Sequence, residues 1–172
     1  MHSETKKDKK DKRNEKMIEL YGTINPLQNK EILQKTKRKL YYNNIFFDSK
    51  PELAFYIWLK DHKIRFEYHP SLINYEFNGK IYKYEPDFKV FNTLIEIKGL
   101  HFFENRNPNC KMINPYHKNK TPEQIKIANE LAETKHQFMI KIGVKIITNY
   151  NKYISYVYNK YGNNYLNKFK VR

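Results

Sequence analysis

The spacing of hydrophobic and polar positions predicts alternating helices and strands from residue 46 onward. Alternation of apolar and polar residues indicates strands, whereas apolar residues three and four positions apart indicate helices with one buried side. We expect strands over 46–47, 64–68, 72–77, 80–91, 94–99 and 144–148, and helices over 50–62, 121–142 and 150–161. This order predicts an α/β sandwich in which helices flank a mixed β-sheet.

Capping signals support two of these helix starts. Ser49 and Glu52 have the spacing of a capping box, and Thr121 and Gln124 repeat it at the start of the longest expected helix. The stretch 104–120 between the last predicted hairpin and that helix is polar and contains two prolines. We expect a long loop there, and a long loop inside a compact domain is usually functional or disordered.

The chain before residue 43 has a different character. Residues 1–16 are charged and low in complexity, which predicts a disordered basic arm. Residues 17–42 predict a helical extension whose second helix, over 29–40, is basic. We expect the remaining 43–172 to form the main domain.

The stretch EPDFKVFNTLIEIKG, residues 85–99, carries the strongest indication of chemistry. Alternate residues of a strand share a face, so Glu96 and Lys98 point the same way. A hairpin would bring Asp87, on the preceding strand, beside them. Two carboxylates and a lysine suit a hard divalent cation and the activation of water beside it, which points to phosphodiester hydrolysis. The alternative for Glu96 and Lys98 is an exposed salt bridge on a solvated face.

Charge narrows the class of partner. The formal net charge is +15 and the pI is near 9.6, which favours a polyanion such as nucleic acid. An AT-rich genome is a competing source of the many lysines, because Lys, Asn, Ile and Tyr all have AT-rich codons.

Other patterns exclude several kinds of site. Cys110 is the only cysteine, so neither an internal disulfide nor a cysteine-based zinc site can form, and the histidines lack zinc-site spacing. No apolar run approaches the roughly 18 residues that span a bilayer, and no apolar segment follows the Lys-rich N-terminus as in a secretory signal. We therefore expect a cytoplasmic protein with no membrane partner.

Glu52, Pro86-Asp87 and Glu96-x-Lys98, in this order, resemble the PD-(D/E)xK nuclease superfamily of restriction enzymes and resolvases. The resemblance covers roughly residues 45–148 and agrees with the expected order of elements. It implies a restriction-endonuclease-like core with a mixed β-sheet flanked by helices, to which the basic helical extension is attached at the N-terminus.

The same resemblance implies a catalytic set. Asp87, Glu96 and the backbone carbonyl of Ile97 would bind Mg²⁺ or Mn²⁺, with Glu52 joining directly or through a water, and Lys98 would be the catalytic lysine. Hydrolysis would leave a 5′-phosphate. Two acidic neighbours should keep Lys98 protonated, which favours a role in orienting water and stabilising charge over that of a free base. Glu52 is also explained as the capping-box partner of Ser49.

A second resemblance lies in the N-terminal extension. Residues 20–28, LYGTINPLQ, are similar to the KYGxxNPxQ units of phage homing endonucleases, which occur in series and are thought to contact DNA. Only one copy is present. The alternative is an ordinary helical hairpin that packs on the core.

Together these patterns predict a metal-dependent DNA endonuclease, homing-endonuclease-like, encoded by a phage or mobile element and acting in a bacterial host cell. A Holliday-junction resolvase or a restriction-type enzyme is the nearest alternative, and a non-catalytic nucleic-acid-binding protein on a nuclease fold is an alternative of another class. Cutting both strands of double-stranded DNA requires a homodimer or two successive nicks. The expected DNA contacts are Lys30, Lys35, Lys37, Arg38, Lys39, His101, Lys135, His136 and Gln137.

Overall fold

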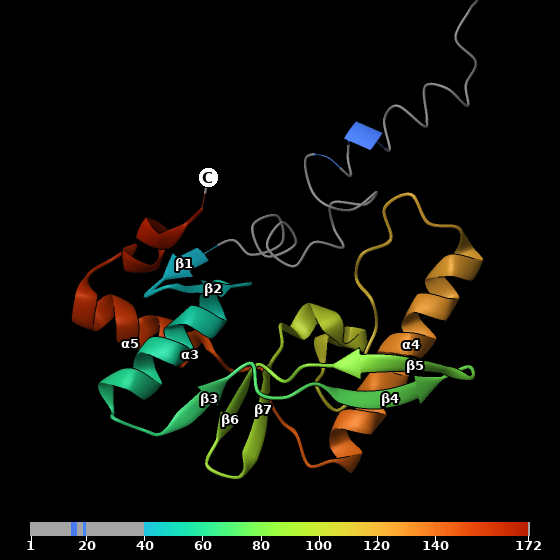
Figure 1. Ribbon diagram of the computed structural model, residues 1–172, viewed down its shortest axis with the longest axis horizontal. Helices are drawn as coiled ribbons and strands as arrows, with labels where there is room; N and C mark the ends of the chain where they lie inside the picture. The colour runs from blue at the N-terminus through green and yellow to red at the C-terminus, as the bar shows by residue number, and fades with distance from the viewer. Residues whose placement is uncertain (1–14, 17–18, 20–39, 172) are drawn as a thin grey trace, which may run out of the picture.

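The computed structural model describes residues 15, 16, 19 and 40–171 of the chain. The expectations for the KYGxxNPxQ-like unit and for most of the basic arm lie outside the described residues. So do five of the expected DNA contacts, which are Lys30, Lys35, Lys37, Arg38 and Lys39. Residues 40–171 form a mixed α/β body in which helices lie on both sides of a sheet (Figure 1).

The central sheet has four strands in the order β3-β6-β7-β8. These are Phe66–Tyr68, Phe88–Val90, Thr93–Ile97 and Lys145–Ile147. The first three strands are antiparallel, and β8 runs parallel to β7 because a helix intervenes between them. The prediction of a mixed sheet is therefore confirmed.

Three α-helices in the described body match the predicted ones to within one residue at each end. They are α3 (Lys50–Asp61), α4 (Pro122–Lys141) and α5 (Asn151–Tyr161). Thr121 caps α4 in the complete capping box that was expected. Ser49 caps α3 as expected, but the carboxylate of Glu52 accepts from the N–H of Asp48 and not from that of Ser49. Among the described residues, no helix combines the length and apolar character that crossing a membrane requires.

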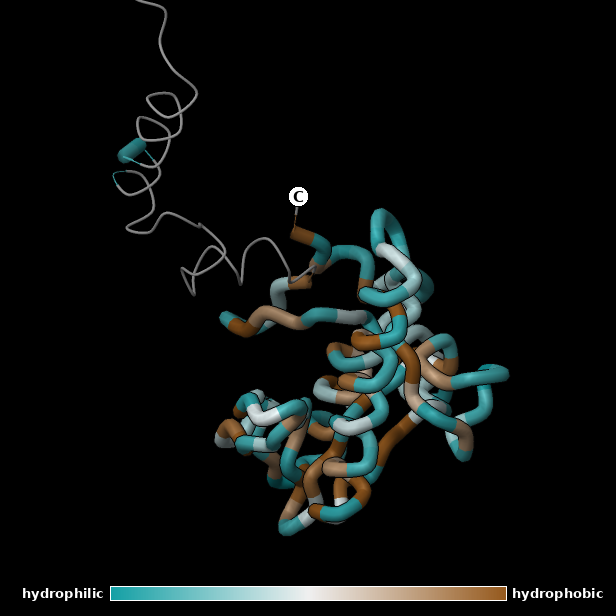
Figure 2. The backbone as a smooth tube through the Cα atoms, turned by 90° about the vertical axis from the view of Figure 1, so that its right-hand side faces the viewer, coloured by the Kyte–Doolittle hydropathy of each residue, from teal (hydrophilic) through white to brown (hydrophobic). Residues whose placement is uncertain are grey.

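Each face of the sheet is covered by its own hydrophobic cluster. On one face, Phe88 and Ile95 pack with Phe55 of α3 and Tyr153 of α5. On the other face, α4 packs with the hairpin of β4 (Ile73–Phe77) and β5 (Lys80–Tyr84). Figure 2 shows hydrophobic and hydrophilic residues alternating along this body, as expected for elements that each bury one side.

The expected single strand over 80–91 is wrong, because the structure divides it into β5 and β6. The two halves belong to different sheets, and Glu85-Pro86-Asp87 connects them. Proline has no N–H to donate to a strand ladder, so the buried Pro86 ends the pairing. Asp87 therefore lies immediately before β6 and not within a strand.

The expected helix over 29–40 is wrong at its last residue, because Leu40–Tyr42 form β1 and pair with β2 (Ile45–Phe47). Asn43 and Asn44 turn the chain with positive φ angles of 51° and 61°, as a two-residue hairpin turn requires. Leu40 is buried in the same cluster as α3 and α5. The last residues assigned to the extension 17–42 are thus part of the folded body.

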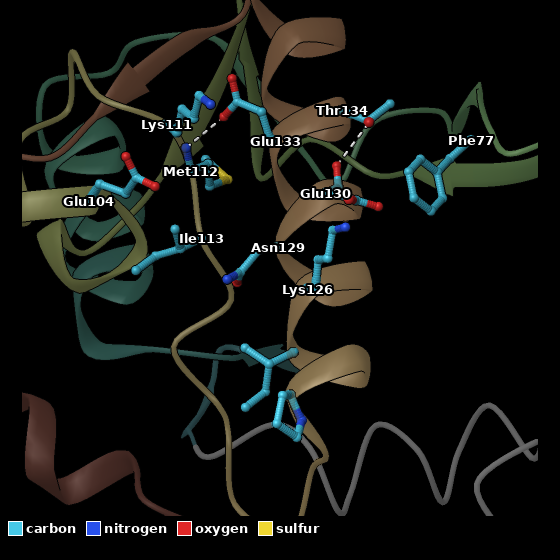
Figure 3. Close-up of a pocket in the computed structure, with 12 residues that line it drawn as sticks. Phe77, Glu104, Lys111, Met112, Ile113, Lys126, Asn129, Glu130, Glu133 and Thr134 are labelled. Atoms are coloured by element: carbon cyan, nitrogen blue, oxygen red, sulfur yellow. Dashed lines mark hydrogen bonds between the residues drawn. The ribbon is translucent and has the colours of Figure 1, made fainter.

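The stretch predicted as a long loop is tied to α4 over much of its length. A short 3₁₀ turn at Leu100–Phe102 precedes it, and another at Glu104–Arg106 begins it. The N–H of Met112 donates to Glu133 of α4 at 2.7 Å, a bond drawn in Figure 3. The N–H of Asn114 donates to Asn129 at 2.9 Å. These bonds hold residues 112–114 of the loop against α4.

Phe88 and Phe91 offer a matched test of the core. Phe88→Ala should lower the free energy of unfolding by about 3–5 kcal/mol, because it removes a fully buried ring between α3 and the sheet. Phe91→Ala should change it by less than about 0.5 kcal/mol, because Phe91 is 72% exposed. Chemical denaturation measures both, and equal losses would contradict the core described here.

Candidate active site

The four residues expected to be catalytic meet at the end of the central sheet. A cavity of about 420 Å³ there is lined by Glu52, Asp87, Ile97 and Lys98. Glu52 comes from the first turn of α3, and Lys98 directly follows β7. Phe88 pairs with Ile95, so one step further along the antiparallel register Asp87 lies opposite Glu96. The sheet register thus assembles the acidic set.

Asp87 is held by the backbone of the neighbouring strand. Its Oδ2 accepts a hydrogen bond from the N–H of Ile97 at 2.7 Å. Burial raises the pKa of Asp87 well above its ordinary value, and the negative charges of Glu96 and Glu52 raise it further. The bond from Ile97 and the charge of Lys98 lower it by less. Ionisation of Asp87 beside the carboxylates of Glu96 and Glu52 is therefore unfavourable.

Glu96 is the most buried member, with 2% of its surface exposed. Its Oε1 lies 2.8 Å from the ammonium of Lys98 and 3.6 Å from that of Lys135, and its Oε2 accepts from the hydroxyl of Tyr84 at 3.0 Å. Burial alone would raise the pKa of Glu96, but the two lysines and these hydrogen bonds bring it below its ordinary value. Glu96 is therefore ionised, and the alternative of an exposed surface pair does not fit its burial.

Lys98 lines the cavity beside Glu52 and Asp87. Burial alone would lower the pKa of Lys98, but Glu96, then Asp87 and Glu52, raise it above its ordinary value. This direction agrees with the expectation that Lys98 stays protonated. Its side chain keeps 21% of its surface exposed, so the ammonium can reach a molecule in the cavity.

Glu52 combines a capping role with a place in the cavity. Its N–H donates to Ser49 Oγ at 3.3 Å, as expected for a cap. Its carboxylate accepts from the hydroxyl of Ser49 at 2.8 Å and from the N–H of Asp48 at 3.2 Å. The sequence predicted two compatible roles for this residue, and the geometry allows both.

The other expected contacts separate into two groups. Lys135 faces Glu96, and His101 lines the cavity, where its ring approaches the backbone of Gly99 so closely that a Cβ there would lie 2.5 Å from it. His136 is buried against Phe103, so the prediction of a DNA contact at His136 does not fit its position. Gln137 is exposed and donates to Glu133 at 2.7 Å, the residue that also accepts from the N–H of Met112. It therefore lies beside the loop 104–120 and not beside Asp87 and Glu96.

Two parts of this arrangement escaped sequence reasoning. No local pattern indicates a role for Tyr84 or predicts the ion pair of Lys135 with Glu96. No local spacing connects residues 84 or 135 with 96, because β5, α4 and β7 are brought together only by tertiary packing. The one available signal was the end of the β5 pattern, where Tyr84 is followed by Glu85-Pro86.

The donor set suits magnesium better than a metal held by protein alone. Among the described residues, no three His, Cys, Asp or Glu side chains form a group that would hold a metal ion by themselves. Mg²⁺ needs fewer, because it keeps several waters and takes one or two carboxylates together with substrate phosphates. Asp87 and Ile97 line the cavity and could offer a carboxylate and a backbone carbonyl, and Glu96 lies opposite Asp87 in the strand register. A cation would also offset the excess negative charge that raises the pKa of Asp87.

A second cavity, of about 680 Å³, lies between α4 and the loop after β7 (Figure 3). Its acids are Glu104, Glu130 and Glu133, and Glu133 is committed to the N–H of Met112 and to Gln137. Its lining combines apolar side chains with charged ones, and Glu133 also lies 3.6 Å from His136. Glu52, Asp87 and Lys98, three of the four residues expected to be catalytic, line the smaller cavity instead.

No protein-family model, curated protein or solved structure matches this chain. The function proposed below rests on the geometry and charge of the described residues and on the spacing of the motif in residues 85–99.

The raised pKa of Asp87 predicts an unusual effect on stability without metal. A folded-state pKa above the ordinary 3.8 means that Asp87 costs stability increasingly as the pH rises from about 4 to the folded pKa. Asp87→Asn should therefore raise the free energy of unfolding near pH 7, with a gain that vanishes toward pH 4. Denaturation in EDTA across this range measures it.

Asp61 supplies a control of opposite sign. Its carboxylate is bound by Tyr161, Tyr156 and Lys160, and although burial raises the pKa of Asp61, these hydrogen bonds bring it below its ordinary value. Asp61→Asn should lower stability at neutral pH. If both substitutions lower it, the charge distribution described for the acidic set is wrong.

Tyr84→Phe tests the hydrogen bond to Glu96. The substitution keeps the ring and removes one donor to a buried carboxylate, so the free energy of unfolding should fall by about 1.5–3 kcal/mol. Tyr82 is the matched control on the same strand, because its hydroxyl makes no hydrogen bond to any residue that the structure describes. Urea denaturation should show little change in the free energy of unfolding for Tyr82→Phe. If Tyr84→Phe also leaves it unchanged, the hydrogen bond from Tyr84 to Glu96 does not stabilise the fold.

Proposed function

We propose that the protein is a metal-dependent DNA endonuclease of the PD-(D/E)xK type. The observation that carries the proposal is the buried Glu96–Lys98 ion pair, 2.8 Å long, beside Asp87 at the end of the sheet. A charged cluster with a strongly raised carboxyl pKa costs stability, and such clusters are concentrated at functional sites. A protein that only binds DNA would not need such a destabilising cluster of carboxylates.

The order of elements supports the same type. Helix α3 supplies Glu52, β6 and β7 carry the motif, and α4 leads to β8 parallel to β7. This is the arrangement that the resemblance to a restriction-endonuclease-like core implies. Fold alone does not decide function, so the acidic set carries more of the argument than the architecture.

In the proposed mechanism the acids hold the cation and the lysine holds the water. Asp87, Glu96 and the carbonyl of Ile97 would bind Mg²⁺ or Mn²⁺, with Glu52 at the edge of the same cavity. When bound, the cation lowers the pKa of a coordinated water and offsets charge on the phosphate. Protonated Lys98 orients that water and stabilises the negative charge that develops on the phosphate.

The proposed substrate is double-stranded DNA. The net charge of +15 supports a polyanionic partner, and Lys98 supplies a positive charge at the cavity that a phosphate could approach. A homing-like role and phage origin rest on the motif at 20–28, which lies outside the described residues. Resolvase and restriction-type activity share the same chemistry and differ in the DNA they recognise.

Plasmid cleavage tests the function. Wild-type protein should nick or cut plasmid with Mg²⁺ and not with EDTA, while Asp87→Ala and Lys98→Ala should each lose about 10²-fold or more in rate. Lys89→Ala is the control, because Lys89 forms a largely exposed pair with Glu67 and should keep full activity.

A branched junction and a linear duplex of equal length, run in parallel, separate resolvase from homing-like cleavage. If the wild type and both site variants bind DNA and leave every substrate intact, the protein is not a nuclease.

A further inference from the structure

The wall of the small cavity beside the acids is aromatic. Phe102, Tyr116 and Tyr150 line it together with His101. Tyr116 is 64% exposed although it contacts Phe102. A large aromatic side chain so exposed at the mouth of a charged cavity does not contribute to the core, and its surface is available to a ligand.

The two rings are linked to the lysine of the acidic set. The centroids of Phe102 and Tyr116 lie 6.0 Å apart with an edge-on angle of 75°. The ammonium of Lys98 lies 5.1 Å from the centroid of Phe102. A molecule stacked on Tyr116 would therefore be separated by the ring of Phe102 from Lys98, the residue to which we assign contact with the phosphate.

Backbone contacts hold the segment that carries Tyr116. Its N–H donates to Asn114 Oδ1 at 2.9 Å, and the N–H of Asn114 donates to Asn129 of α4, also at 2.9 Å. The ring is thus presented from an anchored segment while most of its surface faces solvent. An anchored aromatic loses little conformational freedom when it binds.

Basic residues follow Tyr116 directly. His117 and Lys118 are exposed, and Lys120 is half-buried. An exposed aromatic ring combined with positive side chains is the usual composition of sites that bind single-stranded nucleic acid, where bases stack on rings and the backbone follows the charge. Charge and aromatic surface here point to the same partner as the acidic set.

We propose that Tyr116, with Phe102 edge-on beside it, is a stacking platform for an unpaired base next to the phosphate that is cut. In a duplex the faces of the bases are covered by their neighbours and only the edges are open in the grooves, so a ring can stack only on a base that has left the helix. The preferred substrate is therefore DNA with an unpaired nucleotide beside the cleavage point, such as a gap, flap or branch. This inference rests on the proposed nuclease function.

Binding without cleavage tests the platform. Full-length Asp87→Ala protein in EDTA is titrated with a duplex that carries unpaired 2-aminopurine in a short gap, and with the same duplex fully paired. The gapped DNA should bind about fivefold or more tightly, and stacking should change the 2-aminopurine fluorescence. Adding Tyr116→Ala should remove both the preference and the fluorescence change, whereas Tyr116→Phe should retain them.

Phe91→Ala is the control for loss of an exposed ring. Phe91 is 72% exposed and lies at the β6–β7 turn, at the opposite end of β7 from Lys98, so the preference should persist. Tyr116→Ala should unfold at the same denaturant concentration as its parent, because the side chain is exposed.

The outcomes separate the two proposals. Equal affinity for both DNAs, unaffected by Tyr116→Ala, overturns the platform, and wild-type plasmid cleavage would then still support the nuclease. A Tyr116-dependent preference in a protein whose wild type cuts no DNA keeps the stacking site and overturns the nuclease. Failure to bind either DNA overturns the platform and contradicts the proposed substrate.

Discussion

Burial of Glu96 between two ammonium groups is the interaction on which the rest of the site depends. A carboxylate with 2% of its surface exposed stays ionised only when charge and hydrogen bonds replace water. Lys98 directly after β7, Lys135 on α4 and Tyr84 on β5 do so. The pairing of β7 with its neighbours, the position of α4 and the end of β5 are therefore coupled through a single side chain.

This pairing leaves the cluster unbalanced. Burial raises the pKa of Asp87, and the negative charges of Glu96 and Glu52 raise it further, while Glu96 is itself paired with the nearby lysines. Such imbalance is unfavourable for the protein alone and favourable for binding a cation, because an added positive charge relieves it. The cost in stability and the proposed chemistry thus have the same physical origin, which is a common feature of functional sites.

Much of the architecture could be predicted from local pattern. The capped starts of α3 and α4 and the alternation in β4 and β7 are signals within a few residues, and they were found at or near their observed positions. The errors fell where tertiary context overrides local pattern. Pro86 divides one expected strand between two sheets. Leu40 is in a strand of the β1–β2 hairpin, where its side chain is buried in the core.

By itself, the sequence determined the three helices, the mixed sheet and a cluster of Asp87, Glu96 and Lys98, because capping, strand alternation and hairpin register are local properties. Only the tertiary structure decided which groups complete that cluster and how they ionise. The ion pair from Lys135, the bond from Tyr84 and the burial that raises the pKa of Asp87 all arise from elements distant in sequence. Electrostatic energies depend on distance and burial, and no spacing along the chain contains either.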